Sequence, residues 1–256
     1  MNNFIIALFT GTGNTLYVAK QFPGAQIYFI NDLLSGKKTL PEDMDKLGIF
    51  FPIYHGGYPY AVEQFIQNIL GKRDNTKLEY LFVVNTALKK NRTANYNLER
   101  VLFNNGLGLS YAASLRFPSG NLKHNKKQLS EMKTLAAANQ RALQIESIVK
   151  DTENRVIKIP KYVPCAFLVN IIAKNRNIPS RQTELTISDK CNGCRICAKI
   201  CPMENIAIKD GKATYGDSCT HCYACYHRCP EKAIAYKKKT IGQYSGLVDT
   251  NELYRR

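Results

Sequence analysis

Eight cysteines in the last third of the chain have the spacing of metal ligands. They form two runs with the same pattern, Cys191-x2-Cys194-x2-Cys197-x3-Cys201 and Cys219-x2-Cys222-x2-Cys225-x3-Cys229, and a proline follows each run. A small secreted protein would spread disulfide-forming cysteines along its chain, whereas here only Cys165 lies outside the runs. The pattern therefore indicates metal binding rather than disulfides.

The spacing within each run favours a cluster over a single ion. Three cysteines two residues apart can hold one face of a cubane, and the fourth is directed towards a second cluster. Structural zinc, the competing metal, usually takes two C-x2-C pairs separated by a longer loop. We expect two 4Fe-4S clusters with crossed ligand sets, which are Cys191, Cys194, Cys197 and Cys229 for one, and Cys219, Cys222, Cys225 and Cys201 for the other.

From about Glu184 to Lys237 the chain resembles the bacterial two-cluster ferredoxins. The resemblance implies a small α+β domain with pseudo-twofold symmetry, in which each cysteine run leads into a helical turn and a short strand. Asp210-Gly211 is a hairpin signal between two β-prone pieces. His221 and His227 lie among the ligands, but cysteines fill all eight ligand positions, so neither histidine is needed as one.

A second group of residues suited to chemistry lies near the N-terminus, in the sequence FIIALFTGTGNTLYVAK. An apolar run of strand length passes into helical composition, so TGTGNT is a strand-to-helix loop. Such a loop suits an anion, because backbone N–H groups point at the ligand and glycines allow close approach. The loop residues are Thr10, Gly11, Thr12, Gly13, Asn14 and Thr15. They include no lysine or arginine, and neither the ATP nor the dinucleotide pattern is present.

The pattern Thr-x-Thr-Gly-x-Thr resembles the FMN phosphate loop of flavodoxins. Apolar strand-like runs recur at 25–30, 46–53, 79–86 and 109–117 between helix-compatible segments, which predicts five strands alternating with helices in a parallel sheet. A long helix is expected over 129–150. The resemblance implies an α/β flavodoxin-like domain with strand order 2-1-3-4-5 and a ligand beyond the carboxyl ends of strands one and three.

The same resemblance assigns the flavin ring to the loops after the third and fourth strands. The residues that it implicates there are Pro52, Tyr54, His55, Gly56, Gly57, Tyr58 and Thr86. A tyrosine at 54 or 58 would stack on the ring or serve only in the turn, and the sequence leaves this open. Lys89, Lys90 and Arg92 would raise the flavin potential if they lie near the reduced ring, or would form a solvated basic loop.

The chain carries a net charge of +16. A cationic electron carrier is steered towards acidic proteins, so we expect an acidic redox partner, either a ferredoxin or an oxidoreductase. No zinc finger, RNA-binding signature or basic helix with base-stacking aromatics is present in the sequence, which argues against nucleic acid. The start of the chain has no leader pattern and no stretch of membrane-spanning length, so we expect a cytoplasmic protein.

These patterns divide the chain into four segments. They are a flavodoxin-like FMN-binding domain at 1–155, a basic apolar connector at 156–183, a two-cluster domain at 184–237 and a basic tail at 238–256. We expect the connector to pack between the domains, although contact with an anionic membrane surface is the alternative. Cys165, in an apolar part of the connector, is expected to be buried.

The chain as a whole resembles the flavodoxin-ferredoxin fusion proteins of anaerobic bacteria and archaea. This resemblance implies an iron-sulfur flavoprotein that passes electrons between two 4Fe-4S clusters and FMN without substrate chemistry of its own. The alternative is a ferredoxin-dependent flavin reductase acting on a small acceptor, with Tyr54, His55 or Tyr58 as the proton donor. A redox sensor is a third class, but the sequence contains no recognised DNA-binding or signalling module.

Overall fold

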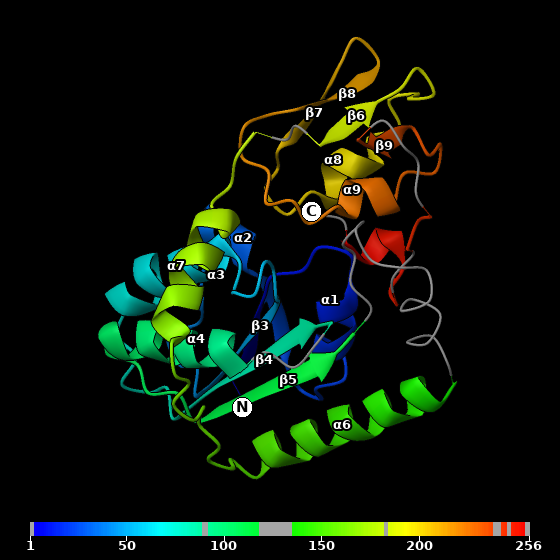
Figure 1. Ribbon diagram of the computed structural model, residues 1–256. Coiled ribbons are helices and arrows are strands. Elements are labelled where there is room, and N and C mark those ends of the chain that lie inside the picture. Colours follow the sequence, from blue (N-terminus) through cyan, green and yellow to red (C-terminus); the bar gives the residue numbers. More distant parts are fainter. Residues whose placement is uncertain are drawn as a thin grey trace.

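The N-terminal part of the computed structural model is a doubly wound α/β domain (Figure 1). The structure describes residues 3–88, 92–117, 135–181, 184–237, 242–244 and 247–253. Five parallel strands form one sheet in the order β2-β1-β3-β4-β5. They are β1 (Phe4–Leu8), β2 (Gln26–Phe29), β3 (Lys46–Pro52), β4 (Tyr80–Ala87) and β5 (Tyr111–Arg116). The predicted sheet and its strand order are confirmed.

Helices cover both faces of this sheet (Figure 1). One face packs against α2 (Ile30–Leu34), α3 (Tyr60–Asn68), the short helix η1 (Leu70–Lys72) and α4 (Arg92–Asn104). The opposite face packs against α1 (Asn14–Ala19) and α6 (Leu135–Glu153). Every residue of β1 and β4 is buried, because side chains on both faces of these inner strands meet a helix layer. The helix expected over 129–150 corresponds to α6 within the described residues.

The C-terminal domain is a small α+β unit built from two similar halves. The strands β6 (Leu185–Ile187) and β9 (Ile234–Tyr236) pair antiparallel, and β7 (Ile206–Lys209) forms a hairpin with β8 (Lys212–Tyr215). Asp210 and Gly211 both have positive φ angles, as the predicted hairpin turn requires. Each cysteine run contains a short helix, α8 (Ile196–Ile200) or α9 (Ala224–His227).

The connector packs along the α/β domain. Lys158 extends the sheet beside Tyr111 at the edge of β5, through the hydrogen bonds Ala112 N to Lys158 O (3.0 Å) and Lys158 N to Ser110 O (2.8 Å). The connector then forms α7 (Ala166–Asn177), which packs on α4. The expected burial of Cys165 is wrong, because this residue precedes α7 in a left-handed conformation with its side chain exposed. Alanines take the inward positions instead.

The two domains share one continuous core. Ile200 and Ala224 of the C-terminal domain belong to the same buried cluster as the α1 face of the sheet. Val248 and Leu253, from the C-terminal segment that forms η2 (Thr250–Leu253), complete that cluster. The C-terminal domain therefore lies over the carboxyl ends of the strands (Figure 1). No helix within the described residues combines the length and the apolar character needed to cross a membrane.

Candidate functional site

The loop from Thr10 to Thr15 follows β1 at the carboxyl end of the sheet. Thr10 and Thr15 are buried, and the Oγ1 atoms of Thr15 and Thr86 lie 2.8 Å apart in a hydrogen bond. This bond ties the loop after β1 to the end of β4. Gly13 has a φ of 101°, in the left-handed region where a side chain is strained. The predicted loop residues are therefore brought together with Thr86.

The backbone of this loop fits an anion. The N–H groups of Gly11, Thr12 and Gly13 donate to no backbone acceptor among the described residues. Buried N–H groups are almost always paired, so a run of three without a backbone partner indicates a ligand with acceptor oxygens or solvent. The side chains of Thr10, Thr12, Asn14 and Thr15 line the same pocket. A phosphate group matches this set of donors.

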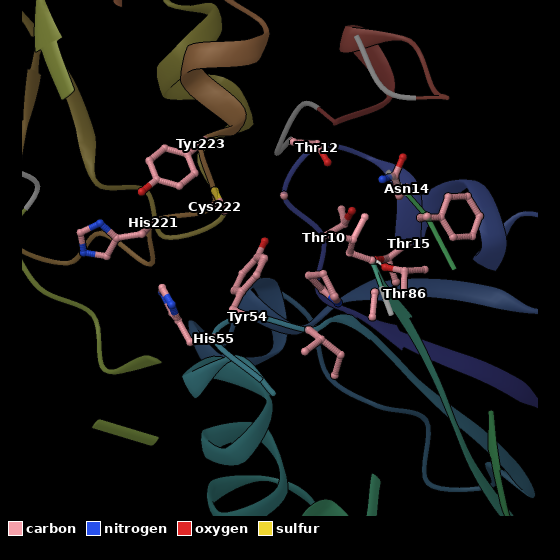
Figure 2. A pocket seen from close by; sticks show the side chains of 16 residues that line it. Thr10, Thr12, Asn14, Thr15, Tyr54, His55, Thr86, His221, Cys222 and Tyr223 are labelled. Atoms are coloured by element: carbon pink, nitrogen blue, oxygen red, sulfur yellow. Dashed lines mark hydrogen bonds between the residues drawn. The ribbon is translucent and has the colours of Figure 1, made fainter. Parts of the chain in front are cut away.

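The pocket beside the loop has walls from both domains (Figure 2). The α/β domain contributes Thr10, Gly11, Thr12, Asn14, Thr15, Pro52, Ile53, Tyr54, His55, Thr86, Ala87, Leu88 and Phe117, and the C-terminal domain contributes His221, Cys222 and Tyr223. Most of the residues predicted for the flavin site are thus gathered around one cavity. Gly13, Gly56, Gly57 and Tyr58 are not part of its lining.

A tight turn follows β3 and sets the direction of its side chains. The N–H of Tyr54 donates to the carbonyl of Gly57 and the N–H of Gly57 to that of Tyr54, both at 2.9 Å. His55 and Gly56 between them have φ angles of 49° and 85°, the two positive values typical of a type I′ turn. Asn177 of α7 donates from Nδ2 to the carbonyls of Tyr54 (3.0 Å) and Tyr58 (2.9 Å). The connector therefore holds this turn in place.

The two tyrosines of this turn have different surroundings. Tyr58 is buried in the core under α3, and burial raises the pKa of its hydroxyl well above the usual range. The Tyr54 ring stands between the loop threonines and the C-terminal domain (Figure 2), where a Cβ atom on Gly11 would lie 2.6 Å from the Tyr54 hydroxyl. The open volume is about 100 Å³. This volume suits a phosphate group.

The eight cysteines surround two separate cavities in the C-terminal domain. One cavity is lined by Cys191, Cys194, Cys197 and Cys229. The other is lined by Cys201, Cys219, Cys222 and Cys225. Each set contains three cysteines of one run and the fourth cysteine of the other, which is the crossed grouping expected from the spacing. No three His, Cys, Asp or Glu side chains within the described residues converge closely enough to hold a single metal ion.

The cysteine sulfurs sit in matching environments in the two halves. Asn205 N donates to Cys201 Sγ, and Ala233 N donates to Cys229 Sγ, both at 3.3 Å. Burial raises the pKa of the Cys197 thiol to about 11 and raises that of Cys225 well above its usual value, with the neighbouring cysteines adding to both shifts. A bound cation would offset this cost, because a metal deprotonates the thiols that it binds.

Tyrosine and histidine side chains lie in and beside the second cysteine run. Burial raises the pKa of Tyr215, whose hydroxyl lies 3.5 Å from Cys225 Sγ, and the pKa of Tyr223, which donates to Glu184 at 2.6 Å. His221 forms a hydrogen bond of 3.0 Å with Ser180, and burial lowers its pKa. His227 is buried and accepts from Tyr244 N at 3.0 Å. Both histidines therefore have structural partners.

The structure adds one residue that the sequence did not indicate, Arg228. Its Nη2 donates to the carbonyl of Thr12 at 3.0 Å, so the loop does meet a guanidinium, supplied by the other domain. No motif around Arg228 identifies it. Lys89 and Lys90, predicted to follow β4 near the flavin, lie outside the described residues, as does the side chain of Arg92.

Residues 190–234 match the family model of the 4Fe-4S dicluster domain. Among curated proteins, none matches the chain in sequence. The solved structure of the Trp repressor binding protein from Bacillus subtilis is similar over 60% of this chain and 98% of its own, with 14% identity and a TM-score of 0.39. Rubredoxin oxygen:oxidoreductase from Desulfovibrio gigas is similar over 59% of this chain but only 35% of its own, with 11% identity and a TM-score of 0.37.

The assignment of the N-terminal fold rests on the strand order and the parallel register of the sheet. The dicluster match spans both cysteine runs. The chain thus joins an α/β domain with the flavodoxin strand order to a domain similar to the 4Fe-4S dicluster family.

Proposed function

We propose that this chain is an iron-sulfur flavoprotein that carries electrons between two 4Fe-4S clusters and one FMN. The clusters would be held by the crossed cysteine sets that line the two cavities in 184–237. FMN would be held in 1–155, with its phosphate group on the loop from Thr10 to Thr15. When bound, the flavin supplies a centre that takes up one or two electrons, while each cluster exchanges one at a time.

The observation that carries this proposal is the position of Cys222. This cysteine lines both the second cluster cavity and the pocket beside the anion loop. A Cβ atom on Gly11 would lie only 2.9 Å from the Cβ atom of Cys222. A ligand of the second cluster therefore borders the flavin site directly, which gives a short path for intramolecular electron transfer.

Different residues around the pocket would have different roles in binding the flavin. Thr15 and Thr86 fix the loop to the sheet, and the loop amides and hydroxyls bind the phosphate group. Tyr54, which lines the pocket, would lie along the ring and shield it from water, as aromatic side chains do at apolar ligand surfaces. His221, Cys222 and Tyr223 close the opposite wall.

A carrier fits this geometry better than a reductase of small acceptors. A reductase needs open space beside the flavin for its substrate, and here the C-terminal domain occupies the wall that faces the threonines (Figure 2). Tyr58, one candidate proton donor, is buried away from the pocket, while Tyr54 and His55 remain in its lining. Sustained reduction of quinones, nitro compounds or enones, with electrons supplied by a reduced ferredoxin, would favour the reductase instead.

The first cluster cavity is the more accessible to another protein. Cys194 is exposed, and Lys190 and Arg195 beside it are exposed as well. We expect an acidic redox partner to dock there, so that electrons pass from the partner through the first cluster, then the second, to FMN. The rate of reduction by such a partner should fall as the salt concentration rises.

The test is the cofactor content of protein purified without oxygen. Two 4Fe-4S clusters correspond to about eight iron atoms and eight sulfides per chain, together with about one FMN. Cys165→Ser is the matched control for single cysteine changes in the runs, because Cys165 lies outside both cavities. Intact clusters with no FMN, even after its addition, would overturn the flavin part of the proposal.

A further inference from the structure

The outer side of the anion loop is held by residues from the far end of the chain. Arg228, directly after α9, donates from Nη2 to the carbonyl of Thr12 at 3.0 Å and from Nη1 to Oγ1 of Thr250 at 3.1 Å. Its Nε is buried and has no hydrogen-bond partner among the described residues. Val248 closes over the same side, where a Cβ atom on Gly13 would lie 2.3 Å from Val248 Cγ2.

The bond from Arg228 sets the direction of a loop amide. The carbonyl of Thr12 and the N–H of Gly13 belong to one trans peptide plane and point to opposite sides of it. Because Arg228 holds the carbonyl on the outer side, the N–H of Gly13 is turned to the opposite side. A flip of this peptide would present an oxygen where a phosphate group needs a donor, and losing Arg228 makes that flip easier.

Tyr244 makes a second contact of the same kind. Its hydroxyl donates to Oδ1 of Asn14 at 2.7 Å, which orients the Asn14 amide, and its backbone N–H donates to Nδ1 of His227 at 3.0 Å. Gln243 donates from Nε2 to the carbonyls of Tyr226 and Cys229, both at 2.9 Å. The described segment at 242–244 therefore joins the loop to α9.

These contacts depend on the cysteine runs. The helix α9 has four residues, too few to be stable by its own hydrogen bonds. Cys225 within it lines the second cavity, and Cys229, next to Arg228, lines the first. Cluster ligation on both sides of Arg228 thus fixes the backbone from which its side chain reaches the loop.

We propose that Arg228 and Tyr244 are binding determinants for the phosphate group of the flavin and link its affinity to the presence of the clusters. The inference rests on the proposed function, and deepens it. Loss of the clusters frees α9, releases the Thr12 carbonyl and weakens phosphate binding. Because such coupling is reciprocal, bound FMN slows the loss of the clusters.

The experiment compares FMN with riboflavin, which lacks the phosphate group, on full-length iron-loaded protein without oxygen. Dissociation constants are measured by flavin fluorescence for the wild type, Arg228→Gln, Arg228→Lys, Tyr244→Phe and the control Arg181→Gln, an exposed arginine whose side chain faces Asp217. We expect FMN affinity to fall about tenfold or more in Arg228→Gln and less in Tyr244→Phe, with riboflavin affinity and the control unchanged. A chelator assay then follows cluster loss, which FMN, but not riboflavin, should slow in the wild type.

Equal FMN affinity in the wild type, Arg228→Gln and Tyr244→Phe would overturn the inference and leave the proposed function intact. An equal loss of riboflavin affinity would also overturn it, because the effect would not be at the phosphate group. Should Arg228→Gln fail to hold its clusters, Tyr244→Phe and the chelator assay on the wild type decide the matter. A wild-type protein that holds both clusters but binds no flavin would contradict the proposed function itself.

Discussion

Cys222 lies directly against Gly11, so the second cysteine run approaches the anion loop closely at this point. A Cβ atom placed on Gly11 would be 2.9 Å from the Cβ atom of Cys222, closer than real side chains approach each other. This contact joins the two halves of the molecule at the point where their proposed cofactors meet. Because of this contact, the order in which electrons pass through the proposed redox centres can be tested by experiment.

Serine substitutions at Cys222 and Cys191 should separate the two clusters by function. Cys222 lines the cavity next to the anion loop, whereas Cys191 lines the cavity farther along the domain. We expect Cys222→Ser to abolish fast electron exchange with FMN. Cys191→Ser should keep that exchange and slow the delivery of electrons from an external protein. Rapid mixing without oxygen, followed by flavin absorbance, measures both steps, and the same defect in both variants would contradict the order.

Gly11→Ala should weaken the contact between the domains. The new methyl group would meet the Tyr54 hydroxyl at 2.6 Å and Cys222 Cβ at 2.9 Å, both closer than real side chains approach each other. Overpacking of this kind typically costs about 1–3 kcal/mol. Thermal unfolding and FMN titration measure the effect, and Gly108→Ala is the control, since nothing lies within 4 Å of its Cβ position. If Gly11→Ala is as stable as Gly108→Ala, the contact between Gly11 and Cys222 can rearrange without cost and the prediction is wrong.

Thr15 and Thr86 should behave as a coupled pair. Their hydroxyls are buried and hydrogen-bonded to each other at 2.8 Å. Thr15→Val or Thr86→Val alone leaves one buried hydroxyl without its partner, which costs about 1–3 kcal/mol, whereas replacing both removes the unpaired group. Urea unfolding of the flavin-free protein should therefore give a double variant less destabilised than the sum of the two singles. Strict additivity would show that the bond contributes nothing specific.

Tyr244 should make the C-terminal contact sensitive to alkaline pH. Burial raises the pKa of its hydroxyl from 10.0 to about 12, so the folded protein favours the protonated form that donates to Asn14. The stabilisation is therefore complete below pH 10 and is lost as the pH rises from about 10 to about 12. A pH titration of the wild type, which records tyrosinate absorbance and the amount of bound FMN, should show this loss. The step should be missing in Tyr244→Phe, and its persistence there would assign it to another tyrosine.

The parts of the site that lie close together in the sequence were predictable from it. The crossed cysteine sets follow from a spacing that the geometry of a cubane restricts, and the cavities group the cysteines in that way. The loop from Thr10 to Thr15 is contiguous, so its composition alone predicts an anion site. The parallel sheet followed from apolar runs that alternate with helical segments, whereas its strand order came from the resemblance to flavodoxins.

The remaining parts depend on tertiary contacts that no local pattern contains. Tyr54 and Tyr58 share one turn, and only the packing of α7 shows which of them faces the pocket. Cys165 lies in an apolar segment, yet the inward positions of α7 go to alanines, and the cysteine is left exposed. Arg228 reaches a loop 216 residues away in the chain, so its partner cannot be inferred from its neighbours.

The contacts that complete the anion loop also determine when, during synthesis, this loop can fold. Thr12 and Asn14 are synthesised before their partners Arg228 and Tyr244, which follow 216 and 230 residues later. Contacts this distant in sequence form late, because a long stretch of chain must be closed before they stabilise anything. The sheet can therefore fold during synthesis, whereas the loop reaches its final form only after Arg228 and Tyr244 have emerged from the ribosome.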